Sequence, residues 1–126
     1  MKPILLITLV LVIIFVSGLL MYDYISKTSK SIDTELAKLD KEVRINKWIP
    51  AYKILSTMEN KWIDLKDKWA LFVDHQEIDN IDLSISKMKE YIKKNDTVDA
   101  LAEISSLRLL FEHIPKKESL TLTNVL

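Results

Sequence analysis

The sequence predicts an all-α protein in which an N-terminal transmembrane helix continues into an up-down-up-down four-helix bundle. Three observations predict this fold class. The run from Ile4 to Tyr22 has no charged side chain, the rest of the chain repeats apolar residues at intervals of three and four, and Gly18 is the only glycine. Intervals of three and four place side chains on one face of an α-helix. A domain without glycine is poorly suited to the tight hairpin turns of β-sheets.

The apolar run has the length of a membrane span. As a helix it is roughly 28 Å long, close to the ~30 Å hydrocarbon thickness of a bilayer. A cleaved signal peptide is the alternative, because Val16 and Gly18 suit the two small positions before a cleavage site. The run continues beyond that point through Leu19–Met21, which favours a span. We therefore expect residues 1–22 to be a transmembrane signal anchor, with the lipid bilayer as the partner of Ile4–Tyr22.

Two rules for the orientation of the anchor disagree. Lys2 precedes the run, whereas four lysines follow it closely: Lys27, Lys30, Lys38 and Lys41. A count of basic residues places the C-terminal domain in the cytoplasm. A very short basic head before a long apolar run is instead typical of secretory signals. We favour the second rule, which predicts a single-pass protein of the cell membrane with an extracytoplasmic C-terminal domain.

Residues 23–115 are predicted to form the antiparallel bundle, and its first helix continues from the anchor to about Asn46, since no helix breaker lies between Gly18 and Pro50. Its apolar stripe is Ile25, Ser29, Ile32, Leu36, Leu39 and Val43. The second helix is expected to begin between Asn46, a good N-cap, and Pro50, which a first turn tolerates. Its stripe is Trp48, Tyr52, Leu55, Met58, Trp62, Leu65, Trp69 and Phe72. We expect the tryptophans to fill the core, with an exposed ligand-stacking platform as the alternative.

The third helix is predicted from about Asp74 to near Asn95, because Asp74 and Glu77 have capping-box spacing. Its stripe is Ile78, Ile81, Ile85, Met88 and Ile92. Asp96 and Asp99 mark the start of a fourth helix, with the stripe Ala100, Ile104, Leu107, Phe111 and Ile114. Pro115 is expected to end this helix. The tail, residues 116–126, is expected to pack on the bundle through Leu120, Leu122, Val125 and Leu126.

One end of this bundle is a candidate metal or ligand site. Antiparallel pairing of the third and fourth helices places His113 opposite Ile78, which gathers four polar side chains at one end: His75, Glu77, Asp79 and His113. Imidazole and carboxylate are ligands for divalent metals. The alternative, which we favour, is that the carboxylates cap and stabilise a helix N-terminus and His113 stabilises a C-terminus.

Composition excludes several function classes. The chain has 18 basic and 18 acidic residues, so no net charge points to nucleic acid. The absence of cysteine excludes thiolate metal sites and a thiol nucleophile, and the near absence of glycine excludes glycine-rich phosphate loops. We expect no enzyme activity and no cofactor. Two functions remain: a membrane-tethered interaction or scaffold module that contacts another envelope protein or itself, and an extracytoplasmic metal- or ligand-binding or sensing bundle that uses the His75/Glu77/Asp79/His113 end.

Several segments together resemble a bacterial family known as domain of unknown function 4363. They are the N-terminal anchor, Trp62 and Trp69 seven residues apart, Asp74-His75-x-Glu77-Ile78-Asp79, Ala102-Glu103-Ile104, and Glu112-His113-Ile114-Pro115. The resemblance covers essentially the whole chain. It implies a small, helical, single-pass membrane-anchored protein, and it implies no reaction, cofactor or functional residue.

Overall fold

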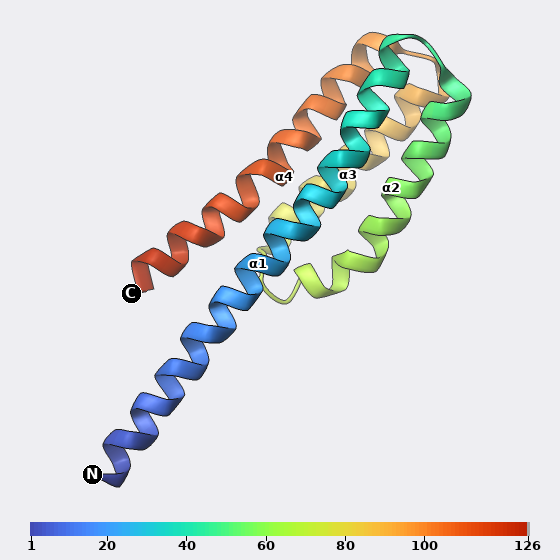
Figure 1. Cartoon of the computed structure of the whole chain (residues 1–126). Helices are drawn as coiled ribbons and strands as arrows, with labels where there is room; N and C mark the ends of the chain where they lie inside the picture. The colour runs from blue at the N-terminus through green and yellow to red at the C-terminus, as the bar shows by residue number, and fades with distance from the viewer. Residues whose placement is uncertain (126) are drawn as a thin grey trace.

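The structure is a computed structural model that describes the backbone of residues 1–125 and the side chains of residues 1–117 and 119. It contains four helices and, in the described residues, no strand: α1 (Lys2–Arg44), α2 (Trp48–Trp69), α3 (His75–Lys93) and α4 (Thr97–Val125). Figure 1 shows that successive helices run in opposite directions. Helix α1 packs against both α2 and α4, and α3 packs more extensively on α4 than on α2. The predicted all-α bundle is confirmed.

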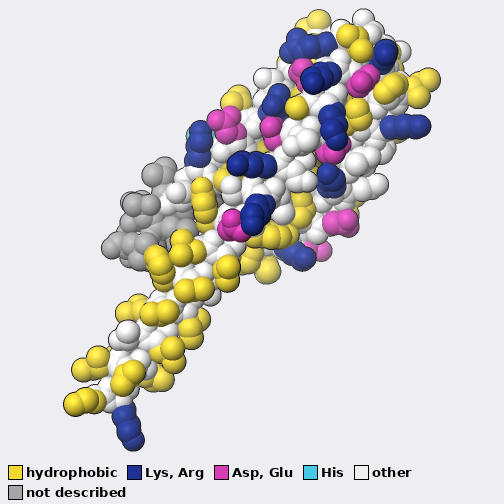
Figure 2. Space-filling view, viewed as in Figure 1, with side chains coloured by type: hydrophobic (Ala, Val, Ile, Leu, Met, Phe, Trp, Pro, Cys, Tyr) yellow, Lys and Arg dark blue, Asp and Glu magenta, His cyan; other side chains and the backbone are white. Residues whose placement is uncertain are grey.

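Helix α1 runs without interruption from the apolar segment into the bundle. The described chain contains one helix long and apolar enough to cross a membrane, and no residue of its 18-residue apolar window (0%) is buried. In Figure 2 these side chains form an apolar rod that projects from a surface of mixed charge. The second half of α1 buries every position of the predicted stripe, from Ile25 to Val43. One helix therefore carries both the exposed apolar segment and one wall of the core.

Two asparagines make the turns at the end of the bundle far from the apolar segment. Asn46 and Asn95 have φ values of 57° and 55°, the left-handed region usually occupied by glycine. The N–H of Lys47 donates to the Glu42 carbonyl at 3.0 Å, and the N–H of Asp96 donates to the Tyr91 carbonyl at 2.9 Å. The C-terminal ends of α1 and α3 are therefore capped by the same type of hydrogen-bonded motif. The predicted role of Asn46 as an N-cap was wrong: Asn46 lies in the turn just after α1, and Lys47 is the N-cap of α2 without a side-chain hydrogen bond.

The acidic starts of α3 and α4 are close to the prediction. Asp74 is the N-cap of α3, and its carboxylate accepts from the N–H of Gln76 at 3.3 Å, one residue before the expected Glu77. The carboxylate of Asp96 accepts from the N–H of Asp99 at 3.1 Å at the start of α4. A side-chain hydrogen bond with Asp96, together with the charge of Asp96, raises the pKa of the Asp99 carboxyl.

The predicted stripes of α3 and α4 are buried at every position, whereas that of α2 needs one correction. Tyr52 is 44% exposed, and its predicted place in the core is taken by Ala51, which is 0% exposed. The small side chain of Ala51 fits in the first turn of α2, where this helix leaves the α1/α2 turn and lies beside α1. Leu55, Met58, Trp62 and Trp69 are buried as predicted, and the remaining stripe residues pack against the core while partly exposed: Trp48, Leu65 and Phe72.

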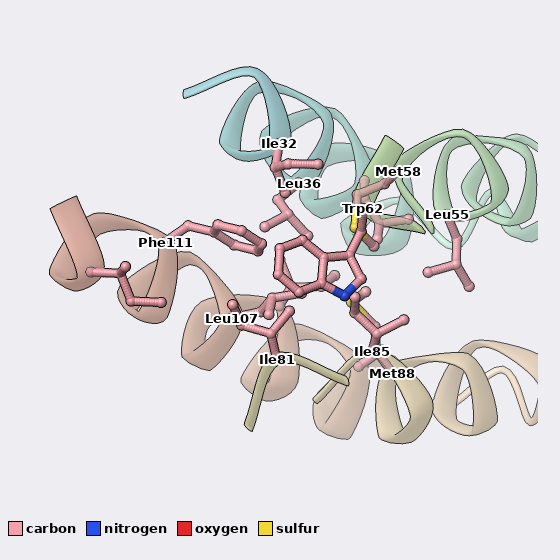
Figure 3. Packing of buried hydrophobic residues seen from close by; sticks show 14 of the residues in the cluster. Ile32, Leu36, Leu55, Met58, Trp62, Ile81, Ile85, Met88, Leu107 and Phe111 are labelled. Atoms are coloured by element: carbon pink, nitrogen blue, oxygen red, sulfur yellow. The ribbon is translucent and has the colours of Figure 1, made fainter. Parts of the chain in front are cut away.

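Three aromatic rings form one cluster within the core. Trp62 and Trp69 of α2 and Phe111 of α4 have ring centroids 5.5–5.7 Å apart, each pair edge-to-face. Figure 3 shows Trp62 surrounded by apolar side chains from all four helices. The indole N–H of Trp69 donates to the Thr28 hydroxyl of α1 at 2.9 Å, and that of Trp62 donates to Asp82 of α3 at 2.8 Å. The tryptophans are core anchors, and the platform alternative is wrong for Trp62 and Trp69.

The prediction that Pro115 ends the fourth helix was wrong. Helix α4 continues through Pro115 to Val125. Proline has no N–H to donate to the carbonyl of Phe111, four residues earlier. In this structure the buried hydroxyl of Ser29 in α1 donates to that carbonyl. A neighbouring helix thus supplies the hydrogen bond that proline removes, and the helix can continue.

The predicted tail is the end of α4, which is helical to Val125. The expected packing of Leu120, Leu122, Val125 and Leu126 lies outside the described side chains. The backbone of this segment runs back toward the apolar segment of α1, as the red end of α4 in Figure 1 shows.

We predict that Trp62→Ala destabilises the full chain in mild detergent by about 3–5 kcal/mol, the usual cost of truncating a buried large aromatic residue. Thermal unfolding followed by circular dichroism measures the effect. The matched control is Trp48→Ala, which removes a partly exposed tryptophan of the same helix. A larger loss for Trp48→Ala than for Trp62→Ala would contradict the central place of Trp62.

We also predict that Ser29→Ala costs about 1–3 kcal/mol, because it leaves a buried carbonyl unpaired. In a Pro115→Ala background, residue 115 regains an N–H for the Phe111 carbonyl, so the same Ser29→Ala change costs much less. A double-mutant cycle of melting temperatures measures this coupling. Ser86→Ala, at an exposed serine of α3, is the control. Strict additivity of the two changes would refute the compensation.

Candidate functional site

The four candidate residues for metal or ligand binding lie at the expected end of the bundle, near the apolar segment. His75, Asp79 and His113 are exposed, and Glu77 is half-buried. Glu77 accepts from the ammonium of Lys117 in α4 at 3.4 Å. Among the described residues, no group of three or more His, Asp or Glu side chains is placed to hold a metal ion. The geometry thus brings Glu77 to a lysine and does not collect the four residues into one cluster.

Asp82, which shares a helical face with His75 and Asp79, faces α2. Its carboxylate accepts from the indole N–H of Trp62 at 2.8 Å and forms an ion pair with Lys66. The hydrogen bond to Asp82 raises the pKa of the Lys66 ammonium. Asp82 therefore joins α3 to α2 and is not turned toward the histidines.

A second polar contact joins α1 to α2 around Glu35, whose side chain is 11% exposed. Lys61 of α2 and Lys38 of α1 approach its carboxylate at 3.2 and 3.3 Å. Burial raises the pKa of Glu35, but the hydrogen bonds from the two lysines outweigh it, so the net pKa is lowered. This buried acid is fully paired and serves to hold the helices together.

A hollow of the described structure lies elsewhere, between α1 and α4. It is an open groove of about 550 Å³ immediately above the apolar segment. Hydroxyl groups and charges line it, together with Leu109, Phe111 and Pro115; the polar residues are Tyr22, Ser26, Ser29, Lys30, Asp33, Ser105, Arg108, Glu112 and Lys116. We call this the α1/α4 groove.

The charges of the α1/α4 groove are unequally paired. Arg108 donates to both oxygens of Asp33, at 2.8 and 3.2 Å, and this contact raises the pKa of its guanidinium. Lys116 pairs with Glu112 at 3.1 Å. Lys30 is the lining cation that has no ion pair among the described residues. Counted over its described lining residues, the groove therefore has one positive charge in excess.

Sequence reasoning missed this groove. Tyr22, Ser26, Lys30 and Asp33 recur at intervals of four, four and three, a polar face of α1 beside its buried stripe. That spacing was available in the sequence. The open space was not, because it depends on which small side chains of α4 lie opposite, and Ser105 is one of them.

We predict that Zn²⁺, Mn²⁺ or Ni²⁺ leaves the melting temperature of the full chain unchanged, because His75 and His113 are exposed and no cluster holds them. The double variant His75→Ala/His113→Ala should shift the stability by about 0.5 kcal/mol or less per site, as for surface substitutions. Thermal unfolding with each metal, and with a chelator as control, measures this. A stoichiometric, histidine-dependent stabilisation would contradict it, since metal at 100-fold over its Kd adds about 2.7 kcal/mol.

Comparison with known proteins agrees with the resemblance read from the sequence. No match is found among curated proteins or among solved structures. The model of one family, described as a domain of unknown function, matches residues 19–125, from the last turn of the apolar segment through the whole bundle. The chain therefore belongs to the family DUF4363.

Proposed function

We propose that this protein is a membrane-tethered helical module that acts by binding other molecules and has no catalytic machinery. The segment Ile4–Tyr22 is its anchor in the cell membrane, and the bundle stands on the extracytoplasmic side. In this proposal the chain is a non-enzymatic interaction or scaffold protein.

The observation that carries the proposal is the unbroken helix α1. Its apolar window is long enough for a bilayer and has no buried residue, whereas a core helix of a soluble protein would be buried. The same helix then supplies seven buried residues to the bundle: Ile25, Ser29, Ile32, Glu35, Leu36, Leu39 and Val43. The second half of α1 is part of the core of the bundle. Because the helix is continuous, insertion of its first half into the bilayer fixes the distance between the bundle and the membrane.

A protein partner, or a second copy of the chain, is the proposed binding target of the bundle. Support comes from the end far from the apolar segment, where Ile49 and Val98 are 79% and 77% exposed and Ile45 is also exposed. The Thr97 hydroxyl donates to the Asn46 side chain at 2.6 Å, which holds the two turns that carry these residues together. Exposed apolar side chains that gather at one place are typical of contact sites.

The test of the anchor is fractionation combined with labelling in intact cells. We expect the chain to stay in the membrane pellet after high-salt and carbonate washing, because its uncharged apolar run partitions strongly into hydrocarbon. A shortened chain in the medium, starting near Leu19, would instead establish a cleaved signal peptide.

Orientation is tested by Lys94→Cys, an exposed position in the α3/α4 turn that avoids the left-handed Asn95. We expect a membrane-impermeant thiol reagent to label it in intact cells. Lys2→Cys, on the other side of the anchor, is the matched control and should react only after lysis. The reverse pattern would place the bundle in the cytoplasm and support the count of basic residues.

A further inference from the structure

The position of the α1/α4 groove relative to the apolar segment is its most informative property. Tyr22, the last residue of the uncharged run, lines its lower end, and Asp33 lies about three turns higher on α1. At 1.5 Å per residue this is roughly 16 Å along the helix. If the run spans the hydrocarbon, Tyr22 lies at the membrane–water interface, where tyrosine is enriched. The groove then opens at the level of the lipid headgroups.

The lining of the groove matches a phosphate-bearing headgroup. Lys30 supplies a positive charge that has no ion pair among the described side chains, and the hydroxyls of Tyr22, Ser26 and Ser105 are additional hydrogen-bond donors. Phosphate oxygens accept hydrogen bonds, and a lysine ammonium is a common point-charge partner for them. Leu109, which is 63% exposed, adds an apolar wall.

The size of the groove fits the same occupant. Its volume of about 550 Å³ lies within the ~300–1,000 Å³ range of small-molecule sites. A headgroup with its glycerol fits this space while its acyl chains stay in the bilayer beside the apolar face of α1. A free phosphate ion would fill only a small part of it.

We propose that the α1/α4 groove binds the headgroup of an anionic phospholipid, with Lys30 as the principal phosphate contact. This inference rests on the proposed anchoring of Ile4–Tyr22. The apolar anchor alone would insert into a bilayer of any lipid composition, whereas the groove would bind one class of lipid.

The test uses the full chain in nanodiscs of phosphatidylcholine that contain a minor fraction of phosphatidylglycerol. Native mass spectrometry after release in neutral detergent measures which lipid stays bound. We expect phosphatidylglycerol to be retained in preference to phosphatidylcholine. Lys30→Gln should lower its retention about fivefold, which corresponds to the ~1 kcal/mol that one basic residue contributes near an anionic surface.

Lys68→Gln is the matched control. Lys68 is exposed, lies at the same end of the bundle beside Trp69, and does not line the groove. The Trp69 indole donates to Thr28, which places this end of α2 at nearly the level of Lys30. We expect Lys68→Gln to retain phosphatidylglycerol as the unmodified chain does. Equal loss in both variants would indicate general surface attraction and overturn the proposal, as would no loss in Lys30→Gln.

Two further measurements separate the possible failures. If inorganic phosphate raises the melting temperature of the detergent-solubilised chain as much as short-chain phosphatidylglycerol does, the site is a phosphate site and the lipid assignment is wrong. Carbonate extraction of each variant tests the anchor independently of lipid choice. A chain that stays in the pellet but shows no preference for phosphatidylglycerol disproves the groove proposal alone, whereas a chain that is extracted disproves the anchor on which it rests.

Discussion

The contact among Trp62, Trp69 and Phe111 is the interaction on which the rest of the bundle depends. The three rings pack edge-to-face at centroid distances of 5.5–5.7 Å, and they join α2 to α4 directly. The two indole N–H groups contact the other two helices: that of Trp69 donates to Thr28 of α1, and that of Trp62 donates to Asp82 of α3. Edge-to-face aromatic pairs add about 0.5–1.5 kcal/mol beyond the burial of their area. The neighbouring apolar stripes fix which faces meet, and the directional N–H contacts fix the register at which they meet.

A second constraint links α1 to α4 at the level of Phe111. Pro115 leaves the carbonyl of Phe111 without its helical donor, and the Ser29 hydroxyl of α1 takes that role. A serine in an otherwise apolar stripe thus has a specific partner. Ser29 and Pro115 both line the α1/α4 groove. The small Ser29 side chain thus donates the hydrogen bond that the proline removes, and it fills little of the space beside it in the groove.

Most of the fold could be predicted from the sequence, because it follows from periodic burial. The stripes of α1, α3 and α4 are buried at every predicted position, and the turns fall where the stripes change phase. Two of the errors arose where one residue has two possible roles. Asn46 suits both an N-cap and a left-handed C-terminal position, and Pro115 ends a helix only when nothing replaces its missing N–H. The candidate site was harder to predict, because a groove depends on facing side chains of two distant segments, such as Lys30 and Arg108. The prominent His75 and His113 lie at one end of the bundle, but they belong to no group of three or more metal-binding side chains among the described residues.

The continuity of α1 has a mechanical consequence. From Tyr22 to Arg44 the helix contains no glycine and no proline, so it has no hinge between its apolar half and its buried half. A helix of this kind transmits rotation and tilt along its whole length. A hydrophobic segment in a bilayer adjusts its tilt to the local thickness of the hydrocarbon layer. Once α1 is held in a bilayer, the lean of the bundle follows the thickness of the membrane beneath it, and the exposed tip at Ile49 and Val98 is displaced sideways by an amount that grows with its height above the lipid.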